Sequence, residues 1–283
     1  MEYRDEARLF ASIDSNVRLG TISLSQSLMA AKANAARQRN VLALALTRVS
    51  ALLLAAQYEA RLNWLVWHPW SRLDEQQRAG CLNGGIASRW EKLLRSALVM
   101  RLAALDEPVE IGAADVPTKL PPPYRGIYYD LRRVKRTHLD PLIDNRNSLA
   151  HGEWAVALTK DASGLNAERT QRIQDLTLFQ VVVTANLLDH FWKCYFDAIV
   201  TRDALERDFA VHHQRMMHAA RRLTSGDEEK WLYNLQMRYK DGRSSHGGLS
   251  MPPHAYGARL PRVDLSPEGT VFLDHRPIAG GDG

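Results

Sequence analysis

The chain has 283 residues, enough for one large or two small domains. Hydrophobic residues make up 45% and charged residues 24%, an ordinary balance for a soluble globular protein. The net charge of +5 favours a polyanionic partner without requiring one. The only two cysteines, Cys81 and Cys194, lie far apart and lack zinc-ligand spacing, which argues against a disulfide scaffold and favours a reducing compartment.

No targeting or membrane segment is expected. The first six residues are too charged to begin a signal peptide. The most apolar run, from Val41 to Ala56, is interrupted by Thr47 and Arg48 and is too short to span a bilayer, so it predicts a buried helix. A cytoplasmic location is therefore expected.

Helices are predicted for most of the first half. Residues 1–20 give no firm pattern, whereas Ser23 to Trp67 contains no proline or glycine and predicts one long helix or two nearly continuous ones. Pro69 ends this helical region. A stripe at helical spacing in its second half is expected to lie at the centre of the core: Leu42, Leu46, Val49, Leu53, Ala56, Ala60 and Trp64.

Further helices follow after a break at Gly80–Gly85. Residues 86–105 form the next predicted helix, the proline-rich residues 107–123 an extended connection, and residues 127–139 another helix. Beyond Gly152, Trp154, Val156 and Leu158 alternate with other residues, which makes a short strand or extended arm plausible.

The last third of the chain divides at Asp241. The ranges 170–200, 203–223 and 227–239 are predicted helices, the first one buried on most sides and the second one capped by Thr201. From Asp241 onward glycine, proline, serine and histidine dominate, which predicts a largely irregular tail with one strand-like segment at 270–273.

The fold class is thus all-α. Residues 1–20 are expected to form an N-terminal segment, 21–225 the helical domain, and 226–283 a short helix with the irregular tail.

The most informative stretch is Arg146-Asn147-Ser148-Leu149-Ala150-His151-Gly152. A short helix is predicted for it, with Asp140 as N-cap, Pro141 in the first turn and Gly152 as the stop. Five residues correspond to about 500° of helical rotation, so Arg146 and His151 diverge by roughly 140° and do not share a face.

This stretch resembles the active-site motif of the HEPN superfamily, all-helical proteins many of which are ribonucleases. Arg146, the polar Asn147 and His151 match the motif with four intervening residues, and Leu149 to Gly152 match its usual ending. The bare Arg-to-His spacing also occurs at Arg133/His138 and Arg207/His212, so the surrounding residues carry the resemblance. It implies a HEPN-like antiparallel helical bundle with this helix in the active site.

The resemblance also implies a chemistry. His151 is the expected general acid or base, because imidazole titrates near neutral pH. Arg146 is expected to bind the scissile phosphate. In such enzymes the RNA's own 2′-hydroxyl attacks, so no metal or cofactor is expected.

Two neighbouring residues have alternative interpretations. Asn147 either contacts the phosphate, orients His151 or is a surface amide. Asp144 either holds the Arg146 guanidinium or favours the first helical turn. HEPN domains often place an acidic or polar residue of an earlier helix opposite the motif, and Glu59 is the candidate here, unless it pairs with Arg61 or stays exposed.

Three further groups of residues bear on RNA, base or metal binding. Arg132, Arg133, Lys135 and Arg136 form a predicted RNA-binding run, although a solvated basic helix face has the same composition. Trp67 and Trp70 are either base-stacking or packing residues. His212, His213 and His218 lack the spacing of a metalloprotease helix, so no metal site is predicted.

A metal-independent endoribonuclease is the function that these observations favour. The divergence of Arg146 from His151 and the resemblance imply a homodimer with a composite site. The resemblance alone also implies a toxin or antiviral effector controlled by an antitoxin or regulatory partner. The alternatives are a non-catalytic HEPN-like module that binds RNA or protein, and a structural helical protein.

Overall fold

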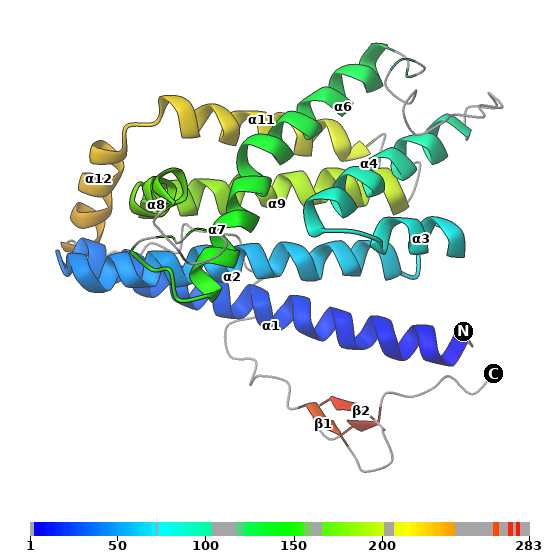
Figure 1. The fold of residues 1–283 in the computed structure, drawn as a ribbon, viewed down its shortest axis with the longest axis horizontal. Coiled ribbons are helices and arrows are strands. Elements are labelled where there is room, and N and C mark those ends of the chain that lie inside the picture. The colour runs from blue at the N-terminus through cyan, green and yellow to red at the C-terminus, as the bar shows by residue number, and fades with distance from the viewer. Residues whose placement is uncertain are drawn as a thin grey trace.

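The computed structural model is all-helical apart from one small sheet (Figure 1). It describes residues 3–71, 73–103, 118, 120, 122–155, 157, 159, 166–200 and 207–240, and the strand residues 263–265, 271–273 and 276–277. The all-α prediction is confirmed. Thr201, predicted as a cap, and most of the predicted connection at 107–123 lie outside the described residues.

The first two helices form an antiparallel hairpin. Helix α1 spans Tyr3–Ala36 and α2 spans Asn40–Trp67, with the turn between them at residues 37–39. Gln38 takes the left-handed conformation with φ 58°, and the Arg39 N–H donates to the Asn34 carbonyl at 2.9 Å. The helical region from Ser23 to Trp67 therefore reverses direction. Residues 3–20 belong to α1, so the boundary predicted at residue 20 falls within a helix.

The buried face of α2 differs from the predicted stripe. Leu42 is 47% exposed and Ala56 is also exposed, so the prediction that this stripe is central to the core was wrong for these residues. Leucine and alanine occupy all sides of the first half of α2, so the sequence period does not indicate which face is buried. The buried face is set by the contacts of α2 with α1 and α9. The residues buried instead are Ala43, Thr47, Ser50, Ala51, Leu54, Ala55, Gln57, Tyr58, Leu62, Leu65 and Val66.

Helix α2 is long and apolar enough to cross a membrane by length and composition alone, but 44% of its most apolar window is buried inside the protein. Core helices of soluble proteins pass the same test, so the structure is compatible with a soluble protein.

The remaining helices build the bundle around α2 and α9. Helix α9, Leu178–Val200, packs against α2, α4 and α11. Around α9, the large aromatic side chains Trp90, Phe191 and Tyr195 are fully buried. The bounds of the others are α3 Glu75–Leu82, α4 Ile86–Ala103, α8 Ala167–Gln174, α11 Phe209–Ser225 and α12 Glu228–Lys240.

The helix predicted over 170–200 is two helices, α8 and α9. The break follows Gln174, and Thr177 starts the second helix with a reciprocal cap. Its Oγ1 accepts from the Gln180 N–H, and the Gln180 Oε1 accepts from the Thr177 N–H, both at 3.2 Å.

Where the structure describes it, the segment after Gly152 consists of a bend at residues 154–155 and irregular backbone rather than a strand. Ala157 is buried, and its N–H donates to Thr170 Oγ1 of α8 at 2.9 Å. Val156 and Leu158 lie outside the described residues.

The tail contains more regular structure than predicted. Strands β1 Val263–Leu265, β2 Val271–Leu273 and β3 Arg276–Pro277 form an antiparallel sheet in the order β1-β2-β3.

Candidate functional site

The motif helix is the end of a longer helical rod. Helix α6, Pro122–Val134, runs into a π-helical turn, η1, Lys135–Leu139, and then into α7, Asp140–Ala150 (Figure 1). A π turn changes the hydrogen-bond ladder locally, which is often seen at functional sites.

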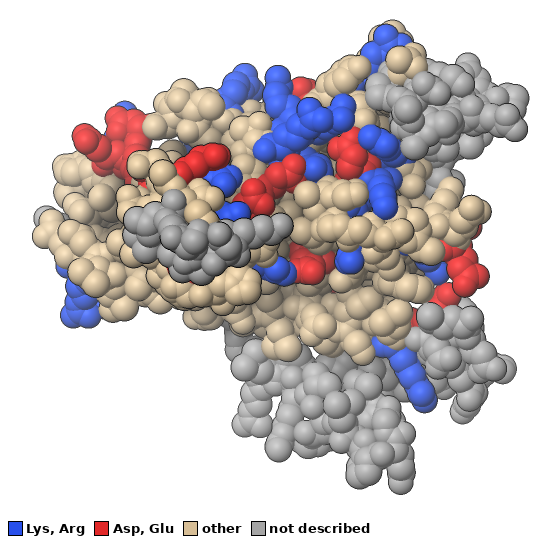
Figure 2. Space-filling view, in the orientation of Figure 1, with Lys and Arg blue, Asp and Glu red and all other residues tan. Residues whose placement is uncertain are grey.

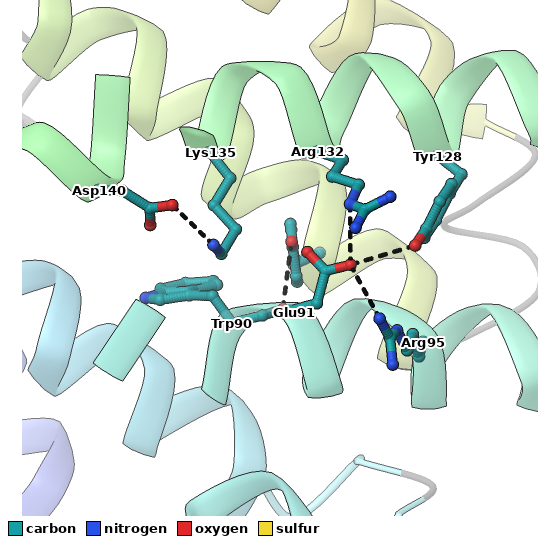
Figure 3. Close-up of polar contacts among 8 residues, drawn as sticks. Trp90, Glu91, Arg95, Tyr128, Arg132, Lys135 and Asp140 are labelled. Carbon is teal, nitrogen blue, oxygen red and sulfur yellow. Dashed lines mark hydrogen bonds and ion pairs between the residues drawn. The ribbon is translucent and has the colours of Figure 1, made fainter. Parts of the chain in front are cut away.

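Asp140 is not an N-cap, so that prediction was wrong. It has helical angles, φ −61° and ψ −47°, and its N–H donates to the Lys135 carbonyl. Pro141 lacks an N–H, and the change of ladder lets the chain pass it without starting a new helix. The Asp140 carboxylate instead pairs with Lys135 Nζ at 2.9 Å (Figure 3).

The C-terminal end of α7 matches the prediction. Gly152 has φ +84°, and its N–H donates to the Leu149 carbonyl at 3.2 Å, while the Glu153 N–H reaches the Ser148 carbonyl at 3.0 Å. These two bonds form the Schellman motif, in which glycine takes the left-handed position. The geometry fixes His151 as the C-cap of the helix.

Arg146 is held by two partners. Its Nη2 forms an ion pair with Glu59 of α2, and its Nη1 donates to Asn147 Oδ1 at 3.0 Å. The structure thus brings together three of the predicted site residues. Glu59 contacts Arg146 rather than Arg61, and the side-chain oxygen of Asn147 faces the Arg146 guanidinium.

The imidazole of His151 stands apart from this group. The residue is exposed, and no described side chain bonds to its ring. The His151 backbone N–H donates to the Asn147 and Ser148 carbonyls at 3.2 Å. Within one chain, the His151 ring thus makes no described contact with Arg146, Asn147 or Glu59.

Asp144 faces a different helix. Its carboxylate lies 3.6 Å from Arg172 of α8, an exposed pair of small energetic weight. The structure gives it no contact with Arg146.

The predicted basic run does not form one face. Arg132 Nε lies 3.1 Å from Glu91, which also contacts Tyr128 and Arg95 (Figure 3). Lys135 is buried against Asp140.

The other two members of the run are exposed. Arg133 pairs with Asp130 at 2.7 Å, whereas Arg136 has no ion-pair partner among the described residues. Figure 2 shows lysine and arginine gathered over the region of α6, with acidic side chains among them. The run is thus partly a set of structural cations.

Two of the three histidines of α11 bind carboxylates. His212 Nδ1 lies 2.7 Å from Asp197, and His213 Nε2 lies 3.1 Å from Asp130. Within the described ranges, no three His, Cys, Asp or Glu side chains converge as a metal ion would need. Trp67 lies under the Arg78 guanidinium, whereas Trp70 is exposed.

Sequence reasoning missed a second charged group. Arg61 of α2 pairs with Asp189 of α9 at 3.1 Å, and Lys193 contacts the same carboxylate at 2.8 Å. Only the i, i+4 spacing of Asp189 and Lys193 was visible as a signal. The Arg61 contact joins residues 128 apart in the chain.

We compared the chain with known protein families, curated proteins and solved structures. No protein-family model matches it, and neither a curated protein nor a solved structure matches it.

Proposed function

We propose that this protein is a cytoplasmic, metal-independent endoribonuclease with a HEPN-like bundle. The observation that carries the proposal is the end of α7. There Arg146 is fixed by Glu59 and Asn147, and His151 follows at an exposed cap with no described partner on its ring.

Arg146 retains the capacity to bind a phosphate. A guanidinium has five N–H donors in a planar fork, and the two contacts described engage only part of it. Glu59 and Asn147 reduce the side-chain freedom that binding would otherwise have to restrict. A phosphate that approaches the exposed edge meets a preorganised donor.

The reaction is a transfer at phosphorus. The ribose 2′-oxygen forms a bond to phosphorus as the bond to the leaving 5′-oxygen breaks, which gives a 2′,3′-cyclic phosphate. His151 takes the 2′-hydroxyl proton or supplies the proton of the 5′-oxygen, worth about 10²–10⁴ in rate. Arg146 stabilises the charge on the phosphate oxygens.

Two chains complete the site in this proposal. Arg146 is directed to α2 while His151 lies at the helix end, so a second α7 would supply the missing group to one phosphate. Light scattering is expected to give a dimer. A 32 kDa monomer at micromolar concentration counts against this part.

The decisive experiment uses mixed RNA in EDTA with the wild type, His151→Ala, Arg146→Ala and the control Arg222→Ala, an exposed residue of α11. Cleavage by the wild type and the control alone, ending in cyclic phosphate, is expected. Equal cleavage by His151→Ala would refute the assigned site.

Growth arrest on expression, relieved by His151→Ala, would support a toxin or antiviral role under a regulatory partner.

A second candidate is a non-catalytic module that binds RNA or protein through the same surface. The Arg146–Glu59 pair favours it, because the carboxylate already neutralises the cation that a nuclease would use. RNA binding without cleavage by purified protein would support this candidate.

A further inference from the structure

A cavity of about 460 Å³ lies among α1, α2, α9 and α11. This volume is within the range of small-molecule sites, roughly 300–1,000 Å³. Its lining includes Gln57 and Arg61, whereas Glu59, between them on α2, faces α7 instead. The cavity is therefore separate from the Arg146 surface and does not depend on the proposed nuclease function.

The inner end of the cavity combines apolar and polar walls. Leu24, Leu54 and Ala185 supply apolar surface. Gln57 is only 3% exposed, and its amide donates to Thr21 Oγ1 while the amide oxygen has no described partner. The Gln57 side chain thus contributes a polar group beside the apolar wall here.

Another part of the cavity lining is cationic. Arg61, Lys193 and Arg215 line it against the single carboxylate of Asp189. Arg61 and Lys193 pair with Asp189, whereas Arg215 is exposed and has no hydrogen bond or ion pair with a described residue. Positive charge therefore remains for an anionic ligand.

A second hollow of about 270 Å³ continues this cationic wall along α11. It shares Asn186, His190 and Arg215 with the first and adds His218 and Arg221. His190 is buried, and its Nδ1 has no described partner. Two joined hollows, one partly apolar and one basic, suit a ligand with two unlike ends.

We propose that these hollows bind a nucleoside 5′-monophosphate, with the base against the Gln57 amide and apolar wall and the phosphate beside Lys193 and Arg215. A phosphate is costly to desolvate, so it belongs at the open end. A base is flat and largely apolar with polar edges, which fits the inner end. Arginine binds phosphate oxygens in a bidentate manner.

The test is calorimetric titration of the full chain with AMP, GMP, CMP and UMP, beside the four nucleosides and inorganic phosphate. At least one nucleotide is expected to bind with Kd of about 100 µM or tighter. It should bind at least tenfold more tightly than its nucleoside and than phosphate. If no nucleotide does so, the proposal is overturned.

Variants place the binding in the cavity. Arg215→Ala is expected to weaken the bound nucleotide about tenfold, because a charge-assisted contact is lost. The control Arg222→Ala, exposed on the same helix but outside both linings, should not change Kd.

Gln57→Leu is expected to weaken nucleotide binding, and circular dichroism checks that this variant is folded. If it does not fold, Arg215→Ala decides. Equal affinity of Arg215→Ala and wild type overturns the assignment.

Discussion

Helix α2 carries two arginine–carboxylate pairs in different environments. On one side Glu59 pairs with Arg146 of α7, with side chains 38% and 31% exposed. On the other, Arg61 pairs with Asp189 of α9, with side chains only 13% and 21% exposed. The same interaction type thus occurs once at the surface and once against the core.

The difference lies in what each pair can do. Solvent screens the Glu59–Arg146 pair, so this pair adds little to the stability of the fold. The Arg61–Asp189 pair is fixed by more contacts. Arg61 also donates to Tyr58 and lies over the Trp192 ring. Burial raises the pKa of Asp189, but Arg61 and Lys193 outweigh it and hold the pKa below its ordinary value. The exposed Glu59–Arg146 pair is suited to binding, and the more buried Arg61–Asp189 pair to holding helices together.

Removing each carboxylate separates the two roles most clearly. Asp189→Ala leaves Arg61 largely buried without its charge partner, and we expect a loss of about 3 kcal/mol in unfolding free energy. Glu59→Ala should cost less than about 1 kcal/mol. Urea denaturation measures both, and equal losses would show that the environments do not differ as described.

Acid should lower the unfolding free energy through His190, a buried histidine of α9. Burial lowers its pKa to about 4, aided by the charges of Lys193, His212 and Arg215, while Asp189 opposes this. As pH falls below about 6.5, the unfolded chain binds a proton that the folded chain does not, so stability decreases towards pH 4. We expect wild type to lose about 2 kcal/mol more than His190→Gln between pH 7 and pH 4.5. Parallel curves in urea titrations would contradict this.

The rod that leads to the motif offers a similar contrast. Arg132 faces Glu91, so Arg132→Met should cost about 1.5 kcal/mol in stability. Arg136 is exposed, and Arg136→Met should leave stability within about 0.5 kcal/mol. If RNA binds here, Arg136→Met lowers the salt dependence of affinity by about one counterion. An unchanged salt slope would remove Arg136 from the RNA surface.

Two glycine substitutions are expected to have small effects of opposite sign. Gly152→Ala places a Cβ at φ +84°, where no atom lies within 4 Å, so the cost is backbone strain of about 1 kcal/mol. Gly80→Ala in α3 meets no neighbour either and has no positive φ, so it should stabilise by about 0.5–1 kcal/mol. Thermal unfolding compares them, and effects of the same sign would argue against the left-handed cap.

Local chemistry was readable in the sequence. Pro69 and Gly152 mark helix ends, because one lacks an N–H and the other tolerates positive φ. The long runs without proline or glycine predicted helices, and the fold class followed. Glu59 was named from the resemblance alone, and its contact with Arg146 became visible only in the structure.

Tertiary structure decided the features for which the local sequence allows more than one arrangement. A helix apolar nearly all round has no preferred face, so packing of α1 and α9 chose the buried side of α2. Asp140 has the sequence of a cap but continues a helix, because α6 and α7 are joined through the π turn. The Arg61–Asp189 pair joins residues 128 apart. Side-chain spacing along one helix determines which residues share a face. Which neighbour that face meets is set by the energy of packing the whole bundle.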